Sequence, residues 1–193
     1  MSKRIALLSA VAFSALAITA SVVAPASAQD KMKSEMSGEK TVMVGGAAMF
    51  PSKNIIQNAV NSKDHTTLVA AVKAAGLVDT LESKGPFTVF APTNAAFGKL
   101  PAGTVDTLVK PENKATLTKI LTYHVVPGKL EASDLTDGKK LKTVEGEELT
   151  VKKSGDKVMI VDAKGGSSTV TIPNVNQSNG VIHVVDTVLM PAS

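Results

Sequence analysis

The sequence of 193 residues contains no cysteine, no tryptophan and a single tyrosine. Without cysteine the sequence offers no disulfide, no thiolate and no lipid-attachment thiol, so packing alone must hold the fold. Aromatic residues make up 3% of the chain, which is too few for the stacking surfaces that bind single-stranded nucleic acids or sugars. Disulfide scaffolds and aromatic binding platforms are therefore excluded.

A strong excess of one charge is also missing. The chain has 21 Lys and Arg against 17 Asp and Glu, a formal net charge of +4. Removal of Lys3 and Arg4 with an N-terminal leader leaves 21 − 2 = 19 basic residues against 17 acidic ones, a balance of +2. So small an excess does not create the basic field that nucleic acid requires, and we expect no nucleic-acid partner.

Long apolar runs are absent except at the start of the chain. Lys3 and Arg4 precede an apolar run over residues 5–23, and Ala26-Ser27-Ala28 follows. This order is typical of a cleaved secretory signal peptide over residues 1–28. An uncleaved membrane anchor is the alternative, because the run approaches the roughly 20 residues that span a bilayer. We expect cleavage, no membrane span afterwards, and a periplasmic or secreted protein.

Residues 29–47 have no helical or strand periodicity, and their Lys, Ser, Glu, Met and Gly content predicts a flexible linker. Residues 48–193 then form one domain, large enough to bury about 68–70% of the surface of its unfolded chain. Methionines at 32, 36, 43 and 49 offer an alternative, since thioethers bind cuprous copper. Methionine is also a common gap-filling residue, which favours the linker.

The first half of the expected domain has helical periodicity. Residues 54–60 place their apolar side chains on one face, and a second helix is predicted from apolar residues that repeat at spacings of three and four, Leu68, Val69, Val72 and Ala75. Asp64 or Thr66 can cap this second helix, and Gly76 can end it. Pro111 opens a further helix in its first turn. Residues 123–126 then have the composition of a strand.

From residue 129 onward the period changes to two. Leu149 and Val151 alternate with polar residues, as do Val158 and Ile160 after a turn, which predicts a hairpin. Residues 169–172, 181–185 and 187–190 predict further strands. Helices early and strands late predict an α+β fold with segregated layers.

Three segments carry a resemblance to a known family. Residues 85–97, GPFTVFAPTNAAF, and residues 179–191, NGVIHVVDTVLMP, resemble the two signature motifs of the fasciclin (FAS1) domain. Between them residues 123–128, YHVVPG, resemble the tyrosine–histidine motif of that family. The resemblance implies a β-sandwich or wedge with helices packed along one side and the two signature motifs together in its core. Its structural motif residues are Phe90, Pro92, Thr93, Asn94, Phe97, Gly180, His183 and Asp186.

The same resemblance implies adhesion, with a cell-surface or matrix protein or polysaccharide as partner. In adhesive members the residues matching Tyr123 and His124 are implicated in receptor recognition. Neighbouring side chains on one strand point to opposite faces, so one of the two can face a partner, and Tyr123 is the better candidate because a tyrosine hydroxyl can anchor an interface. Alternatively both are core residues, as is His183 in its apolar strand.

The common enzyme motifs are missing from the sequence. The sequence has no Gly-x-Ser-x-Gly, His-Glu-x-x-His or phosphate-binding Gly-Lys-Ser/Thr pattern, and we expect a non-enzymatic binding module without a cofactor or metal. The alternatives are a small-ligand or metal-binding periplasmic protein, or a hydrolase that uses Tyr123, His124 and His183. Lysines between residues 139 and 164 alternate with acidic residues, which is typical of solvated strands; an anionic surface polymer is the alternative partner. Oligomeric state is left open.

Overall fold

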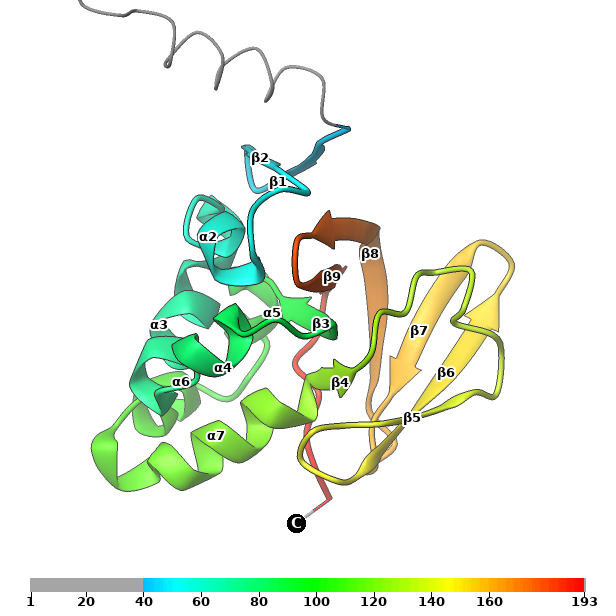
Figure 1. The fold of residues 1–193 in the computed structure, drawn as a ribbon. Helices are drawn as coiled ribbons and strands as arrows, with labels where there is room; N and C mark the ends of the chain where they lie inside the picture. Colours follow the sequence, from blue (N-terminus) through cyan, green and yellow to red (C-terminus); the bar gives the residue numbers. More distant parts are fainter. Residues whose placement is uncertain (1–39, 193) are drawn as a thin grey trace, which may run out of the picture.

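The computed structural model describes residues 40–192. The expected signal peptide and most of the expected linker lie outside the described residues. Figure 1 shows the helices gathered on one side of the molecule and the long strands on the other, with a small hairpin above them. The predicted α+β fold, a wedge of sheet with helices along one side, is confirmed.

The hairpin consists of β1 (Val42–Val44) and β2 (Ala47–Met49). Gly45 and Gly46 join the strands with φ of 58° and 76°, which glycine adopts without steric cost. The linker expected over residues 29–47 therefore overlaps an ordered element and is wrong for residues 42–47. The alternation of buried Val44 and partly buried Val42 with exposed Met43 is typical of a strand, but three residues are too few to predict one within a polar segment.

Three short helices follow: α2 (Ile55–Ala59), α3 (Thr66–Ala75) and α4 (Val78–Glu82), with a 3-10 turn, η1 (Lys63–His65), before α3. Asn54 closes a capping box with Gln57 at the start of α2. Gly76 ends α3 with φ of 73°, as predicted. Neither Asp64 nor Thr66 caps α3, because His65 holds the cap position without a side-chain bond.

The second helical group contains α5 (Asn94–Gly98), α6 (Thr104–Leu108), the 3-10 turn η2 (Pro111–Asn113) and α7 (Lys114–Tyr123). The strand predicted over residues 123–126 is wrong for Tyr123 and His124. Tyr123 is the last residue of α7, His124 is its C-cap, and β4 (Val125–Pro127) begins afterwards. The apolar stripe of α7 packs against α3, and this packing outweighs the strand propensity of Tyr123.

Seven strands form one mixed sheet in the order β4-β3-β9-β8-β7-β6-β5. The remaining strands are β3 (Phe87–Pro92), β5 (Lys140–Lys142), β6 (Glu148–Ser154), β7 (Lys157–Val161), β8 (Ser167–Gln177) and β9 (Gly180–Val185). Only the β3 and β9 pair is parallel; the other strand pairs of this sheet are antiparallel. Val144 N donates to Val125 O at 2.8 Å, so the two ends of the sheet approach each other.

The two signature segments meet in the centre of this sheet. Phe90 of β3 lies beside His183 of β9, and Ala91 lies beside Val184, which confirms the expected contact. The strand expected at residues 187–190 is absent. There the backbone N–H of Leu189 donates to His124 Nε2, and that of Met190 donates to Asp162 Oδ2, so side chains replace a neighbouring strand.

Candidate functional site

Tyr123 closes the last turn of α7 and is fully buried. Its hydroxyl oxygen accepts a hydrogen bond from Ala163 N at 2.9 Å, which ties the helix to the loop after β7. Burial raises the pKa of the hydroxyl, so it stays neutral at physiological pH. A direct contact between Tyr123 and a partner, which the sequence suggested, requires an exposed hydroxyl. The Tyr123 hydroxyl is instead buried and bonded within the fold.

His124 is buried immediately after Tyr123, and both of its ring nitrogens are engaged. Nδ1 donates to Ile120 O at 2.8 Å, and Nε2 accepts from Leu189 N at 2.9 Å. This pattern requires the neutral ring with its proton on Nδ1. Complete burial lowers the pKa of His124 from 6.5 to about 4. The ring therefore links α7 to the C-terminal segment and is unavailable as a base or a metal ligand.

His183 is buried at the centre of β9 and carries its proton on the opposite nitrogen. Nε2 donates to Leu130 O at 2.8 Å, while Nδ1 accepts from Asn174 N at 3.3 Å. The ring also stacks on Phe90, with centroids 5.7 Å apart. Burial lowers the pKa of His183 as well. Because His124 and His183 are both satisfied within the fold, they do not form the reactive or metal-binding pair that was the alternative hypothesis.

Asp186 follows β9 and fastens the start of β8. Its Oδ1 accepts from Thr169 N at 2.9 Å and from the Thr187 hydroxyl at 3.0 Å, and Lys99 Nζ lies 3.7 Å from Oδ2. Burial by itself would raise the pKa of Asp186, but these three partners together hold it below its ordinary value. Asp186 therefore acts as an acceptor that organises backbone.

Two neighbouring residues of the first signature segment cap two different helices. Thr93 Oγ1 accepts from Ala96 N at 3.2 Å and so caps α5. Asn94 Oδ1 accepts from Thr67 N at 3.0 Å, which makes it the cap of α3. Asn94 Nδ2 also donates to Lys63 O at 2.8 Å.

The other three motif residues supply packing. Phe97 is buried in the core, and Pro92 is the last residue of β3. A Cβ on Gly180 would lie 2.0 Å from Phe87 O, so the close pairing of β3 and β9 requires glycine there.

Asn179 is a central residue that sequence reasoning missed. Its Nδ2 donates to Leu81 O at 2.6 Å and to Ser83 O at 2.9 Å, and its Oδ1 accepts from Ile55 N at 3.1 Å. One buried amide thus joins α2, α4 and the turn between β8 and β9. Asn179 opens the second signature segment but was not among the expected motif residues, because its partners lie about a hundred residues away in the chain.

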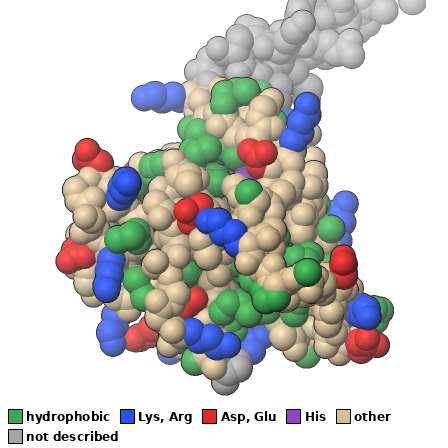
Figure 2. All heavy atoms as spheres, turned by 180° about the vertical axis from the view of Figure 1, so that it is seen from behind, with side chains coloured by type: hydrophobic (Ala, Val, Ile, Leu, Met, Phe, Trp, Pro, Cys, Tyr) green, Lys and Arg blue, Asp and Glu red, His purple; other side chains and the backbone are tan. Residues whose placement is uncertain are grey.

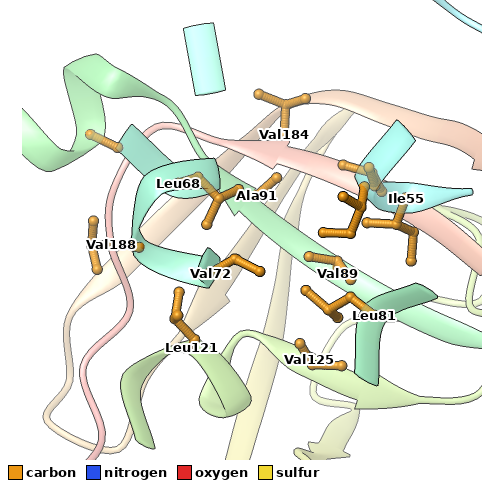
Figure 3. Packing of buried hydrophobic residues seen from close by; sticks show 14 of the residues in the cluster. Ile55, Leu68, Val72, Leu81, Val89, Ala91, Leu121, Val125, Val184 and Val188 are labelled. Carbon is orange, nitrogen blue, oxygen red and sulfur yellow. The ribbon is translucent and has the colours of Figure 1, made fainter. Parts of the chain in front are cut away.

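A cavity of about 40 Å³ lies between the helices and the central strands. Figure 3 shows its core neighbours, with Leu68 and Val72 of α3 facing Val89 and Ala91 of β3. His65 lines this cavity and is buried; its Nδ1 lies 2.9 Å from Ser62 Oγ. Burial lowers the pKa of His65, although a hydrogen bond with the Ala91 backbone and the charge of Asp64 act in the opposite direction. Sequence analysis had placed no function on His65.

Residues 40–192 contain neither a cluster of metal ligands nor a membrane-spanning helix. Within this range no three His, Cys, Asp or Glu side chains lie together as a metal site. None of the helices in the same range is both long and apolar enough to cross a bilayer. Met43 and Met49, two of the methionines considered for copper, are exposed and buried respectively; Met32 and Met36 lie outside the described residues.

The outer surface carries both charges. Figure 2 shows one face on which basic and acidic side chains are interspersed with apolar and neutral groups. The outward faces of β5, β6 and β7 are richer in lysine: Lys140, Lys142, Lys152 and Lys157 are exposed there. Lys140 pairs with Glu148 at 3.3 Å. Within residues 40–192 the other three lysines have no ion pair.

Comparison with known proteins identifies the family. The model of the Fasciclin domain matches residues 63–191. The chain belongs to the fasciclin domain family. Its fold also matches a FAS1 domain pair from the insect cell adhesion molecule fasciclin I, with a TM-score of 0.65 and 19% identity over 73% of this chain and 52% of that one. At this identity the match concerns the fold alone.

Several curated fasciclin relatives are similar in sequence. Protein sll1483 of Synechocystis sp. is 50% identical over 153 residues, which cover 79% of this chain and 82% of the relative. Immunogenic protein MPB70 of Mycobacterium bovis is 41% identical, covering 69% of this chain and 66% of its own length. Cell surface glycolipoprotein MPB83 of the same species is 40% identical, with coverages of 77% and 64%.

Proposed function

We propose that this fasciclin protein is an exported, non-enzymatic binding module that attaches to a protein or polysaccharide of the cell surface or matrix. The observation that carries the proposal is the internal use of Tyr123, His124 and His183. Their polar atoms bond to backbone groups within the fold, so chemistry centred on them would require the core to open. We therefore assign partner binding to the outer surface.

Export is supported from two directions. Residues 1–28 have the composition and order of a secretory signal peptide. The relative MPB83 is named a cell surface glycolipoprotein. Both observations support a periplasmic or extracellular location, where a binding role at a surface would be exercised.

The lysine-rich outward face of β5, β6 and β7 is the surface that we assign to the partner. Along these strands the buried residues Leu141, Leu149 and Val151 alternate with outward-facing ones, so the opposite side of the strands faces solvent. Lys142, Lys152 and Lys157 are exposed on it, and their charges are not neutralised by ion pairs within residues 40–192. An acidic patch on the partner would complement this face and make attachment depend on salt.

The test is affinity capture from envelope and matrix extracts of the producing cell. The sheet variant is Lys142→Glu/Lys152→Glu/Lys157→Glu. The matched control, Lys73→Glu/Lys84→Glu/Lys110→Glu, makes the same change in net charge among exposed lysines of the helical side. We expect the wild type and the control to retain the same partner and the sheet variant to lose it. Equal retention by all three proteins would contradict the assigned face, and the absence of any specifically retained surface component would contradict the function.

A further inference from the structure

Four lysines form one row across the outward face of β5, β6 and β7. Lys140 of β5 lies opposite Thr150 of β6, and Lys152 follows Thr150 by two residues, so Lys140 and Lys152 are diagonal neighbours. Lys157 of β7 stands in the same diagonal relation to Lys152. Such neighbours are about 7–8 Å apart on one face of a sheet. Lys142, two residues from Lys140 along β5, extends the row at its other end.

The row carries an unbalanced positive charge. Glu148 is the one acidic residue within β5, β6 and β7, and it pairs with Lys140 at 3.3 Å. All four lysines are exposed, and Lys142, Lys152 and Lys157 have no ion pair within residues 40–192. Three ammonium groups that follow one another at regular intervals complement a partner that repeats negative charge along its length.

The rest of this face lacks the anchors of a protein interface. The centres of protein interfaces are rich in aromatic residues and arginine and depleted in lysine. Strands β5, β6 and β7 contain no aromatic residue and no arginine. Hydroxyl side chains lie between and beside the lysines instead, at Thr150, Ser154 and, on β8, Ser167. Hydroxyls can donate or accept hydrogen bonds, as the hydroxyl groups of a sugar can.

We propose that this lysine row binds an acidic polysaccharide. Its negative groups pair with Lys142, Lys152 and Lys157, and its hydroxyl groups bond to the serine and threonine side chains of the same face. The inference rests on the proposed surface attachment and names the class of its partner. Figure 1 shows β6 and β7 on the side of the molecule away from the helices, which leaves this face clear for an extended chain.

The number of unpaired lysines sets the expected salt dependence. For single-stranded polyanions the logarithm of the binding constant falls with the logarithm of the salt concentration by about 0.7 for each basic group that pairs. Three lysines give a slope of about −2. Binding should therefore weaken roughly twentyfold between about 50 and about 200 mM salt.

The experiment measures binding of the full protein to polygalacturonate, a polymer of a uronic acid, at several salt concentrations. Poly-glutamate carries the same acidic group on a peptide chain, and dextran is a neutral polysaccharide. We expect saturable binding of polygalacturonate with the slope given above and no binding of dextran. Poly-glutamate should bind about fivefold more weakly, the factor that one lost hydrogen bond accounts for. Equal or tighter binding of poly-glutamate would favour an acidic protein as partner and overturn the proposal.

Two consecutive lysines supply matched variants. Lys152 belongs to the row, whereas Lys153 points to the opposite face of β6, where it lines a pocket with Asp156 and Val158. Both lysines are exposed, and a change to Gln removes one charge from the same strand in each case. Lys152→Gln should weaken polygalacturonate binding about two- to fivefold and reduce the salt slope by about 0.7, and Lys153→Gln should leave the slope unchanged. Equal effects of the two changes would show that overall charge, and not the row, governs binding, and would also overturn the proposal.

The polysaccharide and the surface attachment can fail separately. If the wild type does not bind polygalacturonate but still retains a surface component through the outward face of β5, β6 and β7, the polysaccharide assignment is wrong and the attachment stands. If it retains no surface component either, both are wrong. Because these outcomes concern the wild type, they do not depend on the folding of any variant.

Discussion

Acid should destabilise this protein through His124. The neutral ring donates from Nδ1 to Ile120 O and accepts at Nε2 from Leu189 N. A second proton would have to enter at Nε2, where it would displace the Leu189 N–H and leave a charge in the core. Burial accordingly lowers the pKa of His124 from 6.5 to about 4 in the folded protein.

The magnitude follows from proton linkage. Between pH 6.5 and about 4 the unfolded chain binds a proton at His124 that the folded protein does not bind. The free energy of unfolding therefore falls as the pH falls through this window, and the full contribution is present above it. A difference of 6.5 − 4 = 2.5 pH units at about 1.4 kcal/mol each gives a loss of roughly 3 kcal/mol. Burial of His65 and His183 acts in the same direction.

The assay is urea unfolding of the wild type and of His124→Gln at about pH 7 and about pH 4. A glutamine amide can both donate and accept, but it does not titrate. We expect the variant to be less stable at pH 7 and to lose roughly 3 kcal/mol less than the wild type on acidification. Asp186, whose pKa is held below 3.8, loses its contribution only at lower pH and does not confound this window. An equal loss in both proteins would refute the assignment to His124.

The sequence predicts those parts of the fold whose cause is local. Leu68, Val72 and Ala75 recur at helical spacing before Gly76, and α3 contains all three and ends at Gly76 as predicted, although its N-terminal cap differs. The β6 and β7 hairpin follows from the alternation of Leu149 and Val151. The pairing of β3 with β9 is not local, and it was predicted only because both signature segments resemble known ones.

What the sequence does not predict depends on partners that are distant along the chain. Asn94 was expected only as a motif residue, and the helix that it caps, α3, lies 27 residues earlier in the chain. Tyr123 has strand propensity, but its place in α7 is decided by packing against α3. His65 is buried only because α2, α3 and β3 enclose it. Residue type indicates which groups can form such contacts, and only the fold brings the partners together.

Two substitutions test how far buried polar side chains hold the fold. Tyr123→Phe removes the acceptor of Ala163 N and should lower the free energy of unfolding, measured in urea, by about 1–2 kcal/mol. Capture of the surface partner should be unchanged. Lost capture at unchanged stability would instead show that Tyr123 contacts the partner. Asn179→Ala removes the partners of Ile55 N, Leu81 O and Ser83 O, and should cost about 2–4 kcal/mol and speed amide exchange in α2. Its control is Asn61→Ala, which removes one exposed bond and should change stability by about 0.5 kcal/mol or less. Similar losses in these two variants would mean that Asn179 does not join α2 and α4 to the sheet.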